Sequence, residues 1–296
     1  MKNKILIHKN YNLAKIYQKY FIALIPLMIY GFYKNGILLY LDHSINFINA
    51  FKPILLPLIG ALSGLFVNFI ATKELKFNPL ILYGLIVGMI MPISTNLLLF
   101  AVFMIGLLFL SSFLETKISF NCVCFVKLLV VVLLLVFKNY QYANVVELSQ
   151  DYAFSFVDII FGRGVGGICS SSIVWVIVGF IYLLTDYYYK KEIPIYSIIS
   201  YVIVNLITLI FIKDVSVIIN NLFASSSLFA FVFIAPISNY SSYTPKGKLF
   251  FGILIGILSA ILTIFIGNIE SSLIAIFIVS LLKDQIDKYL GQKFTK

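Results

Sequence analysis

The hydrophobic positions of this chain fall into long runs, which are separated by short polar segments. A helix needs about 20 apolar residues to cross about 30 Å of hydrocarbon, and about ten runs approach this length. The predicted spans are roughly 20–41, 53–71, 78–92, 96–114, 118–137, 168–185, 194–212, 216–235, 248–266 and 271–282, of which the third and the tenth are short. This pattern predicts an all-α fold, that of a polytopic integral membrane protein with about ten transmembrane helices.

Two of these runs end in the same way, with Pro92-Ile93-Ser94 after the third and Pro236-Ile237-Ser238 after the eighth. Each is the third span of a set of five. Because five is odd, the two sets cross the membrane in opposite directions, so the pattern predicts two inverted five-helix repeats. Paired interruptions in equivalent positions indicate a site near the membrane midplane. Backbone leaves the helix there only where protein or a wet cavity satisfies its polar groups. Ordinary interfacial turns after two helix ends are the alternative.

The predicted organisation follows from these boundaries. A cytoplasmic tail (1–19) precedes the first repeat (20–137), and an extracytoplasmic loop (138–167) leads to the second repeat (168–282) and a cytoplasmic tail (283–296). With this topology the non-cytoplasmic segments hold only five of the 22 basic residues, Lys34, Lys52, Lys138, Arg163 and Lys213. Lys127 lies within a span, and the others are cytoplasmic, as the positive-inside rule requires.

Composition limits the class of protein further. Hydrophobic residues make up 61 % of the chain and charged residues 11 %, against about 25 % charged in soluble domains. The mean hydropathy is +1.03. These values exclude a soluble enzyme, a disordered chain and a nucleic-acid-binding domain, and the net charge of +10 is explained by cytoplasmic loops. The abundance of Ile, Lys, Asn, Phe and Tyr is typical of an AT-rich bacterial genome, which predicts a bacterial cell membrane.

Polar residues around the start of the sixth predicted span form a candidate binding site. Gly166 and Gly167 are followed by Ser170, Ser171 and Ser172. Glycines allow a close approach of backbone to a ligand, and amides and hydroxyls that open a helix can hold an anion such as a phosphate. The spacing does not match a Walker motif, and Gly-Ser runs also serve helix packing in membranes.

Other polar residues at membrane depth form a candidate path. A charged residue near the centre of a span usually faces the interior of the bundle, and Lys127 occupies such a place in the fifth span. We expect it either to serve a phosphate of a bound cofactor or an ion pathway, or to pair with the carbonyls of a helix end. The candidate path consists of Pro92, Ser94, Thr95, Asn121, Lys127 and Pro236. The sequence predicts no catalytic residue and no metal ligand, since Cys122 and Cys124 have no nearby His.

Four segments (84–95, 120–127, 158–184 and 244–289) resemble those of a known family. They are similar to its Gly-Leu…Leu-Pro-Pro-Thr-Thr segment, its Phe-Asn-Pro followed by a basic residue, its Asp-Leu-Phe-Leu-Gly…Gly-Ser-Ile-Gly-Glu-Thr-Ser segment, and its last two spans. The family is the membrane subunit family shared by the D subunit of the Rnf electron-transport complex and the B subunit of the sodium-pumping NADH:quinone reductase. The resemblance covers most of the chain from Phe21 onward.

The resemblance implies ten spans in two inverted halves and a redox role. Members carry flavin on the extracytoplasmic side, and their assembly couples electron flow to ion movement. In the family, FMN is attached covalently to a threonine in a Ser-Gly-Ala-Thr motif. This motif is absent here, and Phe154 stands near the position of the acceptor threonine. We therefore expect FMN or riboflavin to be bound noncovalently, at Gly166, Gly167, Ser170, Ser171, Ser172, Ser238, Asn239 and Ser241.

Three functions therefore remain open. The first is a membrane subunit of an Rnf-like electron-transfer assembly, which works with other membrane subunits in the lipid bilayer and is at most part of an ion-translocating oxidoreductase. The second is a transporter of a small polar solute or ion on the same fold. The third is a scaffold subunit without a redox role.

Overall fold

The computed structural model describes residues 13–43, 45–73, 78–115, 118–137, 160–162, 166–212, 226–266 and 270–291. These residues form helices and connecting turns, with no strand among them, as the hydrophobic pattern predicts. Most of the central loop, including Phe154 and Arg163, lies outside the described residues, as do both chain ends and the first half of the predicted span 216–235.

The helices follow the predicted spans closely. They are α1 (Leu13–Phe32), η1 (Tyr33–Leu38), α2 (Leu39–Leu41), α3 (Phe47–Ala50), α4 (Lys52–Thr72), α5 (Pro79–Ile90), α6 (Leu97–Leu114), α7 (Cys122–Val136), α9 (Ile173–Leu184), α10 (Glu192–Ile212), α12 (Ser227–Phe229), η2 (Ala230–Ile234), α13 (Pro245–Ile266), α14 (Ser271–Leu281) and α15 (Lys283–Gly291). The segments η1 and η2 are π-helical turns within longer helices.

Four helical segments in the described part are long and apolar enough to cross a membrane. They are Lys15–Leu41, Lys52–Thr72, Leu97–Leu114 and Pro245–Phe265. Five shorter apolar helices, α5, α7, α9, α10 and α14, accompany them. The chain is therefore a multi-pass membrane protein.

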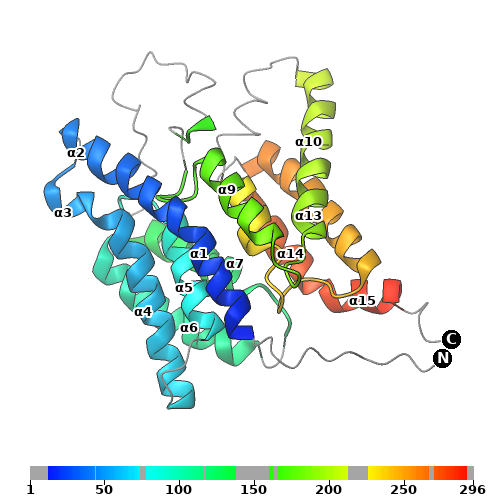
Figure 1. Ribbon diagram of the computed structural model, residues 1–296, viewed down its shortest axis with the longest axis horizontal. Helices are drawn as coiled ribbons and strands as arrows, with labels where there is room; N and C mark the ends of the chain where they lie inside the picture. The colour runs from blue at the N-terminus through cyan, green and yellow to red at the C-terminus, as the bar shows by residue number, and fades with distance from the viewer. Residues whose placement is uncertain are drawn as a thin grey trace.

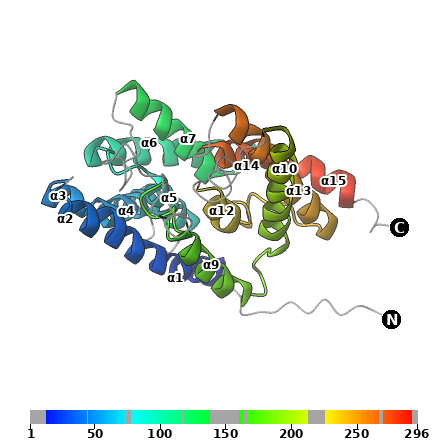
Figure 2. The ribbon, with the colours of Figure 1, turned by 90° about the horizontal axis from the view of Figure 1, so that it is seen from above.

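The helices form two groups in space. Helices α1, α4, α5, α6 and α7 lie in one group, and α10, α13 and α14 lie in the other (Figures 1 and 2). Helix α9 runs alongside α1 and α12 lies between the groups, whereas α15 lies across one end of the bundle (Figures 1 and 2). The helix with the most complete burial is α5, whose residues from Leu80 to Ile90 are all buried.

Close contact between α4 and α5 depends on four glycines, Gly60, Gly64, Gly84 and Gly88. A Cβ atom at Gly60 would collide with the carbonyl oxygen of Gly84, and one at Gly88 would collide with the carbonyl of Leu56. Small residues allow this approach of two backbones, which strengthens van der Waals contact between membrane helices. Close packing against α4 thus fixes the position of α5.

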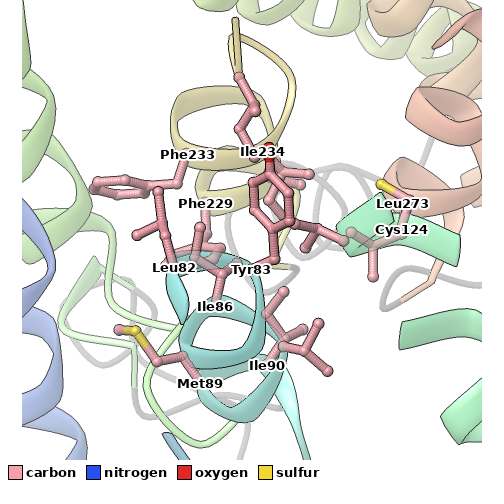
Figure 3. Packing of buried hydrophobic residues seen from close by; sticks show 14 of the residues in the cluster. Leu82, Tyr83, Ile86, Met89, Ile90, Cys124, Phe229, Phe233, Ile234 and Leu273 are labelled. Carbon is pink, nitrogen blue, oxygen red and sulfur yellow. The ribbon is translucent and has the colours of Figure 1, made fainter. Parts of the chain in front are cut away.

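The opposite face of α5 packs against the η2 segment. Figure 3 shows Leu82 and Tyr83 of α5 beside Phe233 and Ile234 of η2, in a cluster of buried side chains. This packing brings together the two helices that precede the Pro-Ile-Ser breaks, which lie far apart in the sequence.

The predicted span 168–185 is wrong at its start. Residues 166–172 are not helical, and α9 begins at Ile173. The reason is a backbone pairing, in which the amides of Ile168 and Cys169 bind the carbonyls of Met91 and Met89. The segment forms a buried turn, in which the amide of Ser170 donates to the carbonyl of Gly167 at 3.3 Å, and α9 has 12 residues.

The α4–α5 packing predicts that Gly60→Ala destabilises the protein by about 1–3 kcal/mol, because overpacking forces the helices apart. Gly106→Ala is the matched control, since a Cβ there meets nothing within 4 Å. Thermal melting in detergent measures both variants. Equal melting temperatures for the two variants would contradict the close packing.

Candidate functional site

The C-terminal end of α5 is covered by residues 166–172. The amide of Ile168 donates to the carbonyl of Met91 at 2.9 Å, and that of Cys169 donates to Met89 at 2.9 Å. These carbonyls have no partner in the helix because α5 ends at Ile90. The segment therefore satisfies the backbone of the first broken helix.

Side chains of η1 and of Ser226 hold this segment in place. The Lys34 ammonium donates to the Ser171 hydroxyl at 2.9 Å, and the Asn35 amide donates to the carbonyl of Ile168 at 2.6 Å. The hydroxyls of Ser170 and Ser226 lie 2.9 Å apart. These side chains are all buried. We call Lys34, Asn35, residues 166–172 and Ser226 the Gly-Ser cluster.

The first break, after α5, is a tight turn with a lysine on its outside. The amide and hydroxyl of Thr95 both donate to the carbonyl of Pro92, at 3.2 and 2.7 Å. Lys52 donates to the carbonyl of Ile93 at 2.9 Å. Asn96 then caps α6 by accepting from the amide of Leu98 at 3.0 Å. The break is thus stabilised by polar contacts on both sides.

Two lysines hold the second break, after η2. The Lys190 ammonium donates to the carbonyls of Ser238 and Ser241, at 3.1 and 2.9 Å. Lys283 donates to the carbonyl of Asn239 at 2.8 Å. Both ammonium groups lie over the ring of Tyr243, at 4.0 and 4.8 Å from its centre. We call these residues the lysine cluster.

Burial governs the charge of this cluster. Burial lowers the pKa of Lys190 from 10.5 to about 7; Lys283 and Lys248 lower it as well, whereas Asp287 and Glu192 raise it. The pKa of Asp287 is lowered, because hydrogen bonds from Ser242 and from residues 243–244 outweigh the effect of burial. Asp287 thereby joins α15 to the residues that follow the second break.

A buried group of phenols lies beside the lysine cluster. Tyr240 donates a hydrogen bond to the carboxylate of Glu115, and the Tyr83 and Tyr240 rings lie 5.4 Å apart. Asn239 donates to the Tyr83 hydroxyl at 3.3 Å. Burial raises the pKa of Glu115, while the hydrogen bond from Tyr240 lowers it. The second break is therefore connected to α5 and to the end of α6.

The remaining predicted path residues link α7 to the second half. The side chain of Asn121 caps α7 by accepting from the amide of Cys124, and it donates to the carbonyl of Ile234 at 3.2 Å. The backbone amide of Asn121 donates to the Ser280 hydroxyl of α14 at 2.9 Å. Lys127 forms an ion pair with Glu270 at 2.8 Å. The side chain of Lys127 is fully buried, and that of Glu270 is 16 % exposed.

The structure separates the predicted binding residues into two places. Gly166, Gly167 and Ser170–172 belong to the Gly-Ser cluster at the end of α5. Ser238, Asn239 and Ser241 belong to the lysine cluster, and Asn239 contacts Tyr83 near the start of the same helix. Among the contacts of the described residues, none joins the two sets directly. In the described part no group of three His, Cys, Asp or Glu side chains is suitable for a metal.

Several residues of these clusters escaped the sequence analysis. Lys34 lies within the predicted span 20–41, and a lysine inside a span is itself a signal of a buried polar site. Lys190, Lys283 and Asp287 resemble ordinary cytoplasmic charges in the sequence. Only the fold shows that they bind the second break.

A bundle of apolar helices with two unwound segments, each held by lysines, defines a multi-pass membrane protein with an internal polar region. The model of the NQR2, RnfD, RnfE family matches residues 1–296. The chain belongs to this family, which confirms the resemblance seen in the sequence. A comparison with curated proteins gives no match.

The lowered pKa of Lys190 predicts a pH dependence. The unfolded chain binds one more proton than the native protein between about pH 7 and the ordinary lysine pKa, so stability rises with pH in this window. Below this pH window Lys190 is charged in both the native and the unfolded protein. We expect the melting temperature of the native protein to rise more than that of Lys190→Met from about pH 7 to about pH 9. Lys191→Met, at the exposed neighbour, is the control and should behave like the native protein.

The Lys127–Glu270 pair predicts unequal effects of its two single variants. Breaking a buried pair costs about 3–5 kcal/mol when a charge is left behind. Glu270→Gln leaves the fully buried ammonium, so it should lower the melting temperature more than Lys127→Met does. The double variant should recover part of the loss. A double variant as unstable as the sum of both single variants would contradict the pairing.

Proposed function

We propose that this chain is the membrane subunit of an Rnf-like, flavin-based electron-transfer assembly. It passes electrons between partner membrane subunits, and ion movement across the membrane is coupled to that flow. The observation that carries the proposal is the family match over residues 1–296. The assembly lies in a bacterial cell membrane, with both ends of the chain in the cytoplasm.

The topology proposed with it has ten spans in two inverted repeats, 20–137 and 168–282. Support comes from the two breaks, since α5 and η2 pack together and each ends in a segment held by lysines (Figure 3). The adjacent pair α1 and α9, the first helices of the two halves, also agrees with such a repeat (Figures 1 and 2).

The proposed cofactor is a noncovalently held flavin, FMN or riboflavin, at the Gly-Ser cluster. The residues fit the phosphate of FMN in their chemistry. Lys34 supplies a buried ammonium, α9 begins at this place, and the buried Ser172 hydroxyl has no hydrogen-bond partner. Cations, hydroxyls and helix N-termini all favour a phosphate. The flavin would supply electron transfer, while these residues bind and orient it.

The proposed ion path follows the breaks. Pro92, Ser94, Thr95 and Pro236 belong to the two unwound segments, and Asn121 joins the second of them to α7. Lys127 lies beside this path with Glu270. The same buried pair favours the second candidate function, the transport of a small polar solute or ion without a redox role, because charges inside a bundle mark such pathways.

The absorbance spectrum of the purified protein tests the cofactor. We expect flavin bands in detergent and no ultraviolet fluorescence of the band in a denaturing gel. Lys34→Met should reduce the flavin content, whereas Lys52→Met, a matched change at the first break, should leave it unchanged. Absence of flavin after expression with flavin supplied would contradict the redox proposal and favour transport or a scaffold role. A fluorescent gel band would contradict noncovalent binding.

A further inference from the structure

A second polar region lies inside the second half of the fold, away from both clusters. It consists of Tyr201 and Asn205 of α10, Ser259 and Thr263 of α13, and Ser271 of α14. All five side chains are buried, at 4 % exposure or less. Helices α10, α13 and α14 are largely apolar, so each buried polar side chain between them needs a partner.

Hydrogen bonds connect most of this region. Asn205 donates to the carbonyl of Tyr201 at 2.8 Å, and Thr263 donates to the carbonyl of Ser259 at 2.7 Å. The hydroxyls of Thr263 and Ser271 lie 2.9 Å apart. The hydroxyls of Tyr201 and Thr263 are 3.5 Å apart, which is long for two hydroxyls. These bonds join α10, α13 and α14 through Tyr201, Thr263 and Ser271, while Asn205 and Ser259 each lie one helical turn from a member of that chain.

Two buried polar atoms there have no hydrogen-bond partner. They are Oδ1 of Asn205 and Oγ of Ser259. A serine inside a helix usually satisfies its hydroxyl with a carbonyl of the preceding turn, as Ser197 of α10 does with Ile193 at 2.8 Å. Ser259 does not, although it lies in a regular helix. Buried polar atoms without a protein partner indicate a bound molecule that supplies the bond.

We propose that Asn205 Oδ1 and Ser259 Oγ each bind ordered water, and that this buried water forms an internal hydration site in the second half of the fold. The bound molecule must donate to an amide oxygen and must donate to or accept from a hydroxyl, and water does both. Buried waters usually have two to four polar partners, and this region supplies buried hydroxyls and backbone carbonyls for that purpose. All the lining groups are neutral, so nothing in the site selects a charged ligand.

The site continues toward the surface through α14. Ser271, which bonds Thr263, directly follows Glu270 in the sequence. Glu270 is partly exposed and pairs with the buried Lys127. The hydration site thus gives the ion pair a polar neighbour within the second half. This inference is independent of the flavin, because no residue of the Gly-Ser cluster takes part.

Replacement of the serine hydroxyl tests the proposal. If Ser259 binds water, Ser259→Ala loses a hydrogen bond and lowers the melting temperature by about 2–4 °C. If the site is dry, the same change removes an unsatisfied hydroxyl and raises the melting temperature, which would overturn the proposal. Ser197→Ala is the matched control, since it deletes an equally buried serine hydroxyl whose bond is within its own helix.

A high-resolution density map of the unmodified protein gives a second, independent measurement. The proposal requires a water peak within hydrogen-bond distance of each of the two atoms, Asn205 Oδ1 and Ser259 Oγ. A map without such a peak would overturn it, whatever the stability of the variants. The flavin spectrum is a separate measurement, so failure of the hydration site and failure of the proposed redox role are distinguishable.

Discussion

The structure depends on the requirement that every backbone polar group inside a membrane has a partner. Two helices, α5 and η2, stop within the protein and leave carbonyls that the helix no longer satisfies. The backbone amides of Ile168 and Cys169 bind the carbonyls at the end of α5. Lysine side chains bind carbonyls within both breaks. Unsatisfied groups in hydrocarbon cost several kcal/mol each. The breaks persist because distant parts of the chain provide these partners.

This requirement also places the polar residues. The first partner segment brings three serines and two glycines to the end of α5, next to Lys34. The second brings Lys190 and Lys283 to residues 238–241 at the other end of the same helix. One buried helix therefore separates two polar clusters of different chemistry. The first has hydroxyls and one ammonium, and suits an anionic ligand. In the second, the ammonium groups are already occupied by carbonyls and stabilise the fold.

Much of the fold could be predicted from hydropathy, because a membrane span depends on a local run of apolar residues. The breaks could be located for the same reason, since Pro92 and Pro236 interrupt such runs. The start of α9 could not. Residues 169–172 are small and lead into a long apolar run, so hydropathy extends the helix over them, whereas the structure pairs Ile168 and Cys169 with Met91 and Met89. The role of Lys190 was equally hidden, because it depends on carbonyls about 50 residues away. Long-range partners of this kind leave no periodic signal.

Amide hydrogen exchange at Ile168 and Cys169 tests the central claim most directly, because it reports the backbone bonds themselves. Measurement of the detergent-purified protein at single-residue resolution should find these two amides exchanging as slowly as those in the middle of α5. Exchange as fast as that of an unstructured peptide would contradict the account, since the end of α5 would then lack the partners on which the break depends.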